Sequence, residues 1–375
     1  MKVWFGTDTG DRTDRNLAIL RERAELDRWK KHQVALSPEE ADILLFFRVG
    51  PIYQQALMRN ALFRDCFPRA YVYDEMDCPL AMLPGLYPSV LRRNYDPRRF
   101  RSFPFWRQYN PWIEAFAGRY REREIEVSFV GSATSPVRKR LFSHAKLAAT
   151  PGLYLENTSG QNDWLASDAQ KKEFFLRYAE IMARSRFVLC PAGAGPGTFR
   201  LFETMQMGRA PILIADDYVL PDGPRWEGFL LQLRESDLDT LPDLVRARRS
   251  EAEELGRLAQ IAWEEHFSRE NYFHYLCETL EDLHRCRTKL KELSKLNDRV
   301  AVEFWSRVGC RKAHGVTRRM LRAAALHVLT ALDKRPLLAV EPPKGGRVRS
   351  GGLAALKDSS DGLDAREITD ERGGG

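Results

Sequence analysis

The chain has 375 residues, of which 43% are hydrophobic and 30% are charged, and this length suffices for two packed cores. It contains no run of 18 apolar residues, and its first residues, MKVWFGTDTGDRTDR, lack the apolar core of a signal peptide. These features argue against a membrane-spanning or secreted protein, and we expect a cytoplasmic one.

Charge is unevenly distributed along the chain. Residues 285–335 hold 14 Lys or Arg against 4 Asp or Glu, a balance of +10, so the remainder of this +7 chain sums to −3. A basic surface favours nucleic acid or anionic membrane, but here it belongs to one appendage. Six cysteines are scattered without a CxxC pair, so neither a disulfide framework nor a zinc site is predicted.

The first part of the sequence alternates strand-like and helix-like segments. Strands are predicted at 2–8, 42–48 and 70–75, with helices at 14–30 and 52–64. The run DILLFFR at 42–48 is continuously apolar, as expected of a strand buried on both faces. This β-α-β-α-β order predicts a parallel sheet covered by helices.

A second alternation follows an irregular connector, which is rich in proline, arginine and aromatic residues and spans 83–112. Strands are predicted at 126–131, 152–157, 187–192 and 210–216, and helices at 137–148, 171–185, 198–207 and, beyond the last strand, within 251–283. Two such units predict an α/β protein with two doubly wound domains that face each other.

Ligands of open parallel sheets bind beyond the carboxyl ends of the strands. In the first unit these ends carry Asp8, Arg48 and the pair Asp74 and Glu75. In the second unit they carry Gly131 and Ser132, the glycine-rich turn 193–197 and the pair Asp216 and Asp217. One unit therefore offers charged side chains, and the other offers bare backbone.

The glycine-rich turn predicts an anion site. Glycines such as Gly193 and Gly195 let the main chain approach a ligand, and the N–H groups that open the next helix carry partial positive charge. Arg200 and Glu203 lie three residues apart and share a helix face. A cation suits a phosphate and a carboxylate suits a ribose diol. An ordinary crossover turn with a surface ion pair is the alternative, and a dinucleotide fingerprint fits poorly because Thr198 stands where its third glycine would fall.

The motif that runs from Ser185 through Pro191, Gly193, Arg200 and Glu203 resembles the exostosin family, glycosyltransferase family 47. The resemblance covers about 127–245 and includes SFVGSATSPVRKRL upstream of the motif. Within the family, the chain resembles a bacterial-type member. It implies a GT-B fold of two Rossmann-like domains and inverting transfer of a sugar from a nucleotide-diphosphate donor, expected to be a UDP-sugar. Carried over, Arg200 meets the diphosphate, Glu203 meets the ribose, and Gly131, Ser132 and Arg138 line the phosphate edge. Thr204 and Arg209 depart from the common alanine and cysteine of the family.

Inverting transfer requires a base for the acceptor hydroxyl and positive groups for the departing diphosphate. Asp74 and Glu75 are the first candidates for the base, followed by Asp77 and Asp8, although aspartates also cap turns. Arginines and a helix N-terminus supply the positive charge, so no cofactor or divalent metal is indicated.

Two basic segments remain. Residues 92–107 mix six arginines with aromatic residues, and we expect a loop that meets the saccharide or lipid-linked acceptor, with a solvated connector as the alternative; nucleic acid is not favoured, because no nucleic-acid-binding motif accompanies the segment. Residues 316–335 combine an apolar stripe with flanking cations, which suits an anionic membrane at the inner face of the plasma membrane, or else a protein surface.

The sequence thus predicts four parts. Residues 1–120 form an acceptor domain, 121–283 a nucleotide-sugar domain with closing helices, 284–340 a basic helical appendage, and 341–375 a disordered tail. The predicted function is a glycosyltransferase of polysaccharide or glycolipid synthesis. The alternative is a non-catalytic protein that binds nucleotide sugar or nucleic acid on the same scaffold.

Overall fold

The computed structural model describes residues 1–7, 15–47, 54, 57, 60–77, 81, 83–105, 110–118, 122–160 and 167–286. Asp8 and Arg48, the basic segment 316–335 and the predicted tail 341–375 lie outside the described residues. In the part that is described, no helix is both long and apolar enough to cross a bilayer.

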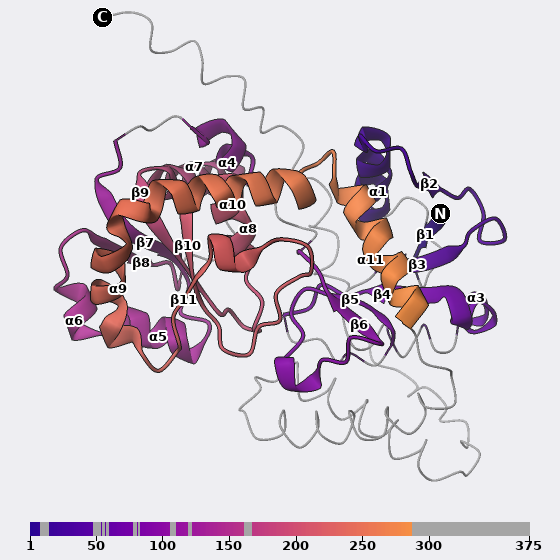
Figure 1. The fold of residues 1–375 in the computed structure, drawn as a ribbon, viewed down its shortest axis with the longest axis horizontal. Helices are drawn as coiled ribbons and strands as arrows, with labels where there is room; N and C mark the ends of the chain where they lie inside the picture. The colour runs from indigo at the N-terminus through magenta and orange to yellow at the C-terminus, as the bar shows by residue number, and fades with distance from the viewer. Residues whose placement is uncertain are drawn as a thin grey trace, which may run out of the picture. The chain divides into compact units, whose positions relative to one another are not determined.

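The first half of the described chain forms a six-stranded parallel sheet of order β2-β1-β3-β4-β5-β6 (Figure 1). Its strands are β1 (Lys2–Gly6), β2 (Gln33–Val34), β3 (Ile43–Phe47), β4 (Ala70–Tyr73), β5 (Gly85–Tyr87) and β6 (Phe100–Ser102). Helices α1 (Arg15–Leu26) and α3 (Ala61–Asp65) belong to this half, whereas the next helix of the chain, α4 (Pro111–Phe116), packs against α7 (Asp168–Ala183) of the second half (Figure 1).

Burial on both faces explains the continuously apolar β3. Successive side chains of a strand point to opposite faces. Ile43, Leu45 and Phe47 join one core with residues of α1, while Leu44 and Phe46 join a second core with Phe63 of α3. The prediction of a strand here is confirmed.

The second half forms a five-stranded parallel sheet of order β11-β10-β9-β7-β8. Its strands are β7 (Ile125–Gly131), β8 (Leu153–Asn157), β9 (Ser185–Pro191), β10 (Ala210–Ile214) and β11 (Leu231–Gln232). Its helices are α5 (Pro136–Ser143), α6 (Ala145–Ala148), α7 (Asp168–Ala183), α8 (Phe199–Gln206), α9 (Leu241–Arg248) and α10 (Ala252–His266). The predicted α/β class with two parallel sheets is confirmed.

Local sequence signals set several helix ends. Ser135 accepts a hydrogen bond from the backbone N–H of Arg138 and Pro136 follows it, so α5 begins there. Ser167 and Gln170 form a capping box at the start of α7. Gly208, with a φ of 67°, follows α8 in the left-handed conformation that glycine favours, next to the predicted helix end at residue 207.

Two predicted segments differ from the structure. The expected helix over 137–148 is interrupted at His144, which separates α5 from α6. The connector 83–112 is not irregular throughout, because it supplies β5 and β6, which complete the first sheet. Strands of three residues are too short to show an apolar period, so the sequence pattern missed them.

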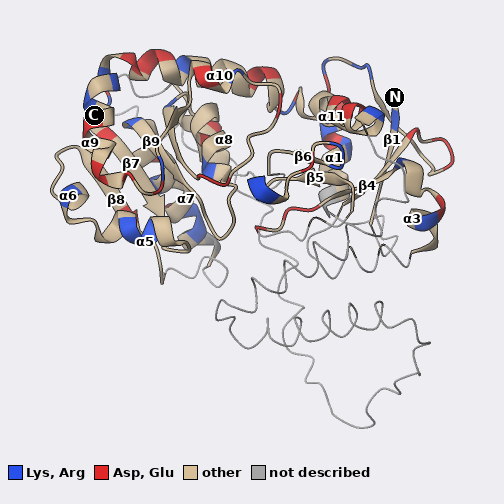
Figure 2. Cartoon of the chain, turned by 60° about the horizontal axis from the view of Figure 1, so that its bottom comes forward, with Lys and Arg blue, Asp and Glu red and all other residues tan. Residues whose placement is uncertain are grey.

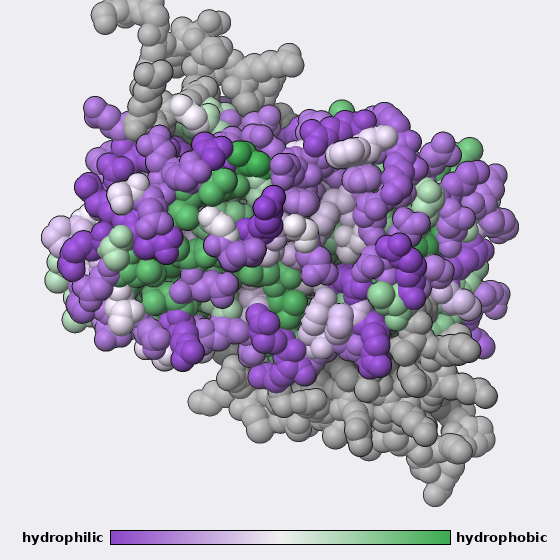
Figure 3. All heavy atoms as spheres, in the orientation of Figure 1, coloured by the Kyte–Doolittle hydropathy of each residue, from purple (hydrophilic) through white to green (hydrophobic). Residues whose placement is uncertain are grey.

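The last described helix, α11 (Tyr272–Cys286), packs on the first sheet although it follows the second sheet in the chain. Its apolar side chains share a core with the strands near the N-terminus. The members of this core on α11 are Tyr272, Phe273, Leu276, Cys277, Leu280 and Leu283. Hydrophilic residues cover most of the face seen in Figure 3, with hydrophobic atoms visible between them over the second-sheet half.

Candidate functional site

Two arginines meet beside the carboxyl end of the second sheet. Arg138 comes from α5 and Arg200 from α8, and the basic residues of both helices are visible in Figure 2. Their guanidinium carbons lie 5.5 and 4.7 Å from the ring centroid of Phe129, which β7 presents beneath them. Both arginines are buried, with relative exposures of 9% and 5%. A shared aromatic ring thus holds two cations close together.

The hydrogen bonds of this pair leave several donors unused. Arg200 donates from Nη2 to the Val130 carbonyl at 2.5 Å. Arg138 donates from Nη2 to the Pro191 carbonyl at 3.2 Å and from Nη1 to Thr134 Oγ1 at 3.3 Å. Arg200 Nε, Arg200 Nη1 and Arg138 Nε are buried without a hydrogen-bond partner among the described residues. Within that same set, neither arginine forms a salt bridge. The pair therefore keeps three buried N–H donors without a partner in the described part of the chain.

Burial and mutual repulsion make this arrangement costly. Burial lowers the pKa of Arg138 to about 9, and the positive charge of Arg200 adds to the decrease. A buried charge without an opposite partner costs several kcal/mol, so groups of this kind point to a functional site. An anionic ligand would supply the missing charge.

Glu203 lies one turn after Arg200 on the same helix and is also buried. The hydroxyl of Tyr178, from α7, donates to Glu203 Oε2 at 2.6 Å. Burial raises the pKa of Glu203 to about 7, against the lowering effects of Tyr178 and Arg200. Tyr178 also lies 5.5 Å from the Arg200 guanidinium, measured from its ring centroid. The carboxylate and both arginines therefore belong to one polar cluster.

The glycines at the strand ends have two different roles in space. A Cβ on Gly131 would lie 2.9 Å from Arg200 Nη2, and one on Gly193 would lie 3.2 Å from Arg138 Nη2. A Cβ on Gly195 would overlap the Asp77 carbonyl and the Ser89 hydroxyl, which belong to the first half. We expected the glycine backbone at these strand ends to be open to a ligand. The structure shows instead that Gly131 and Gly193 leave space for the arginine side chains, and that Gly195 leaves space for the facing segment.

Ser89 connects the two segments directly. Its hydroxyl donates to the Asp77 carbonyl at 2.6 Å and accepts from the backbone N–H of Gly197 at 3.1 Å. Thr198, the first residue flanking α8, keeps a buried hydroxyl that has no hydrogen-bond partner in the described part of the chain. The start of α8 therefore adds polar groups to the arginine pair.

The structure places the candidate bases in different surroundings. Asp74 is buried and accepts hydrogen bonds from Gln54 Nε2 at 2.7 Å and from the Met76 backbone N–H at 3.1 Å. Glu75 is also buried. Asp77 is exposed and adjoins the glycine turn. The packing around its carboxyl raises its pKa, while Arg138 lowers it. Among the candidate bases, Asp77 is thus one on which the charge of Arg138 acts.

Ser132 lies at the edge of the cluster. Its carbonyl accepts from Arg138 Nη1 at 3.4 Å, and its hydroxyl is 3.0 Å from Thr158 Oγ1. The predicted phosphate edge of Gly131, Ser132 and Arg138 is therefore continuous in space, although its role in binding stays a prediction.

The arginine-rich segment 92–107 makes contacts that the sequence did not predict. Arg92 donates to the Tyr218 carbonyl at 2.5 Å, and Arg93 lies 3.4 Å from Asp217. Arg101 pairs with Asp282 of α11 at 2.5 Å. These arginines therefore connect distant parts of the fold, and the role of the segment in meeting an acceptor stays a prediction.

Several residues of the cluster gave no signal in the sequence. Phe129, Tyr178 and Thr198 are ordinary core or capping residue types, and only the fold brings them to the arginines. The unusual Arg209 has a structural role, because it is buried and donates to the carbonyls of Ala183, Met207 and Gly208. Thr204 donates to the Arg200 carbonyl at 2.7 Å and helps to hold the helix that carries this arginine.

Comparison with known proteins identifies the segment that carries the site. Residues 89–247 match the exostosin GT47 domain, which confirms the resemblance predicted from the motif. A probable glucuronosyltransferase of Oryza sativa subsp. japonica is 40% identical over 73 residues, covering 19% of this chain and 17% of that protein. A probable glycosyltransferase of Arabidopsis thaliana is 30% identical over 120 residues, covering 32% and 22% respectively.

These matches extend over about a fifth of each relative's length. Among solved structures, Anabaena HepE in complex with UDP is similar with a TM-score of 0.36 and 12% identity, over 75% of this chain and 100% of that one.

Proposed function

We propose, from the exostosin GT47 domain that the chain carries at residues 89–247, that this protein is a glycosyltransferase with a nucleotide-diphosphate sugar as its donor. The observation that carries the proposal is the buried arginine pair over Phe129, with three guanidinium nitrogens that lack partners in the described part of the chain. A diphosphate supplies both the charge and the acceptor oxygens that this pair lacks.

The arrangement suits the departing group of an inverting transfer. Negative charge develops on the diphosphate as the sugar leaves, and preorganised cations stabilise that charge most strongly where water is excluded. Arg138 and Arg200 are already buried and held by backbone carbonyls, so they need little rearrangement. We infer that Glu203 accepts hydrogen bonds from the ribose, and that UDP is the nucleotide.

The acceptor hydroxyl requires a base on the other side of the sugar. Asp77 is the candidate that we now favour, because it is exposed and the packing around its carboxyl raises its pKa, which brings a carboxylate closer to the useful range for a base. Asp74 is held by two hydrogen bonds within the fold, so it and Glu75 rank below Asp77. Transfer without a divalent metal, a saccharide or lipid-linked acceptor, and a cytoplasmic location remain predictions.

Asp77→Asn tests the catalytic half of this proposal. We expect transfer from the donor that the parent uses, found by screening hydrolysis of a panel of nucleotide sugars, to decrease about 100-fold. UDP affinity should change little, because the carboxylate acts on the acceptor. Asp65→Asn, at an exposed position on the same half, is the matched control and should retain activity. Full activity of Asp77→Asn would exclude Asp77 as the base and return the test to Asp74→Asn and Glu75→Gln.

Absence of any hydrolysis or transfer, together with intact UDP binding, would instead favour a non-catalytic nucleotide-sugar binding protein. Titration with a single-stranded oligonucleotide separates the remaining alternative. Tight oligonucleotide binding without UDP binding would contradict the proposed function.

A further inference from the structure

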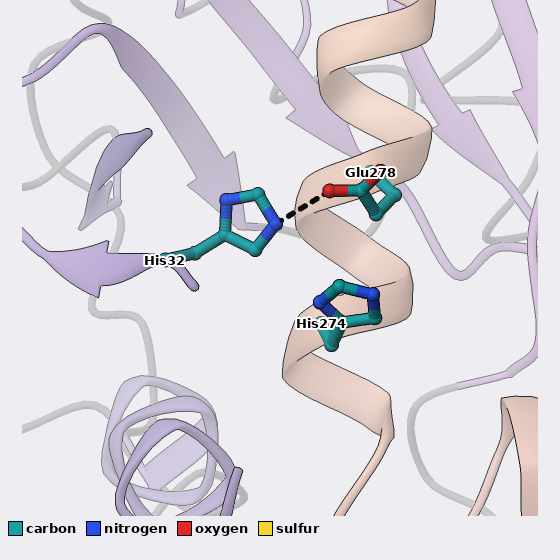
Figure 4. A group of neighbouring side chains, drawn as sticks. All are labelled: His32, His274 and Glu278. Carbon is teal, nitrogen blue, oxygen red and sulfur yellow. Dashed lines mark hydrogen bonds and ion pairs between the residues drawn. The ribbon is translucent and has the colours of Figure 1, made fainter. Parts of the chain in front are cut away.

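A group of metal-ligating side chains lies away from the residues discussed so far. His274 and Glu278 are four residues apart on α11, so they project from the same helix face. His32 reaches them from the segment just before β2. Figure 4 shows the two imidazoles and the carboxylate turned toward one another. One ligand atom from each residue lies within 4.8 Å of the other two.

The three ligand groups lie close together. His32 Nε2 is 2.7 Å from Glu278 Oε1, and the two imidazole centroids are 5.3 Å apart. The His32 side chain is fully buried, whereas the Glu278 side chain is 40% exposed. The buried ligand is therefore fixed, and the exposed one leaves an entry path from solvent.

Two imidazole nitrogens of the group are unused. Nδ1 of His32 and Nδ1 of His274 are buried and lack hydrogen-bond partners within the described ranges. Imidazoles beside a carboxylate are suitable ligands for a cation.

We propose that His32, His274 and Glu278 bind one Zn²⁺ ion, which fastens α11 to the segment before β2. Two imidazoles and one carboxylate form a donor set that zinc accepts, and a water molecule completes four-coordination. With the ion on Nε2 of His32, the ring proton lies on Nδ1, which no hydrogen bond commits to another role among the described residues. The site uses none of the residues proposed for donor binding.

Lys31 competes with the ion. Its ammonium lies 2.7 Å from Glu278 Oε1, the same oxygen that faces His32. The Lys31 side chain is 56% exposed, and exposed ion pairs of this kind contribute little to stability. Zinc can therefore displace the ammonium at small cost, and removal of Lys31 should strengthen binding.

Calorimetric titration of Zn²⁺ into the chelator-treated full chain tests the proposal. We expect one site whose affinity decreases at least about tenfold in His274→Asn and in Glu278→Gln. Glu254→Gln is the control, since it removes an exposed carboxylate of α10 outside the group and should bind as the parent does. Lys31→Met should bind more tightly than the parent. Equal affinity in the parent, His274→Asn and Glu278→Gln would overturn the proposal, as would no binding by the parent.

Trp29 supplies a local readout that does not depend on activity. Its ring stacks on His274 at a centroid distance of 4.8 Å. Co²⁺ bound in place of Zn²⁺ should quench the fluorescence of Trp29, and Trp29→Phe should remove that change. The cobalt absorption should also lack the thiolate charge-transfer band that binding to the exposed Cys286 would give. A thiolate band that persists in His274→Asn would assign the metal to cysteine and contradict the site.

Discussion

Arg138 and Arg200 are buried cations, which is an energetically unfavourable state for single residues, and we attribute it to ligand binding. Each has its guanidinium near the ring of Phe129 and donates to at least one backbone carbonyl. Protein carbonyls orient both cations without neutralising them. A carboxylate in direct salt-bridge contact would stabilise the protein more, but it would also compete with an anionic ligand. We therefore infer that the pair serves binding.

Substitution of Glu203 allows two effects of a buried charge to be measured: its effect on the free energy of unfolding and its effect on ligand binding. Burial raises its pKa in the folded state from 4.5 to about 7, so its ionisation opposes folding. The cost is absent below pH 4.5, develops as pH rises, and is complete above pH 7. We expect Glu203→Gln to raise the free energy of unfolding at pH 8 by on the order of 2 kcal/mol, with little gain at pH 4.

Urea denaturation of parent and Glu203→Gln at the two pH values is the appropriate measurement. The same substitution should weaken UDP binding at pH 8, because glutamine cannot accept two hydrogen bonds as strongly as a carboxylate. A loss of stability at pH 8 would show that Glu203 is instead an essential structural partner of Tyr178.

At the scale of elements, the turn between β9 and α8 brings the two halves into contact. Glycine is needed at position 195 for space, since a Cβ would overlap the Asp77 carbonyl. The described glycines with positive φ lie elsewhere, at 118, 152, 160, 208 and 223. Close packing of the halves, and not a left-handed backbone, therefore accounts for this glycine.

Gly195→Ala should destabilise the protein by about 1–3 kcal/mol, because the added methyl group forces the facing segments apart. Gly228→Ala is the control, since a Cβ there meets no atom within 4 Å. Thermal denaturation of both variants is the measurement. If Gly195→Ala unfolds at the same temperature as the parent, the turn and the Asp77 segment do not pack as the structure shows.

The elements also show what the sequence could predict. Long apolar strands such as β3 and β9 were predicted because their signals are local, and so was most of α7, although its capping box at Ser167 was missed. The three-residue β5 and β6 were missed, since their position depends on pairing with β4 and with each other. The same reason explains the site: Arg200 and Glu203 share a helix and were predicted together, whereas Phe129 and Tyr178 reach them only through the fold.

At the scale of the whole described chain, contacts between residues that are far apart in the sequence join its two halves. Ser89 bonds to Gly197 across 108 positions, Arg101 pairs with Asp282, and α11 completes a core that begins at Val3. The match to the exostosin GT47 domain starts at residue 89, so the matched segment includes strands of both sheets. A nucleotide bound at the arginine pair would lie beside the turn where the two halves meet.

The most direct test of this account is calorimetric titration of UDP and UMP into the parent, Arg200→Ala and Arg140→Ala. Arg140 is an exposed arginine of α5 and serves as the control. If the arginine pair binds the diphosphate, the parent and Arg140→Ala bind UDP more tightly than UMP. Arg200→Ala should lose about 1.5–3 kcal/mol of UDP binding and much of the preference over UMP, with an unchanged circular dichroism spectrum. A folded Arg200→Ala that binds UDP as tightly as the parent would contradict the account.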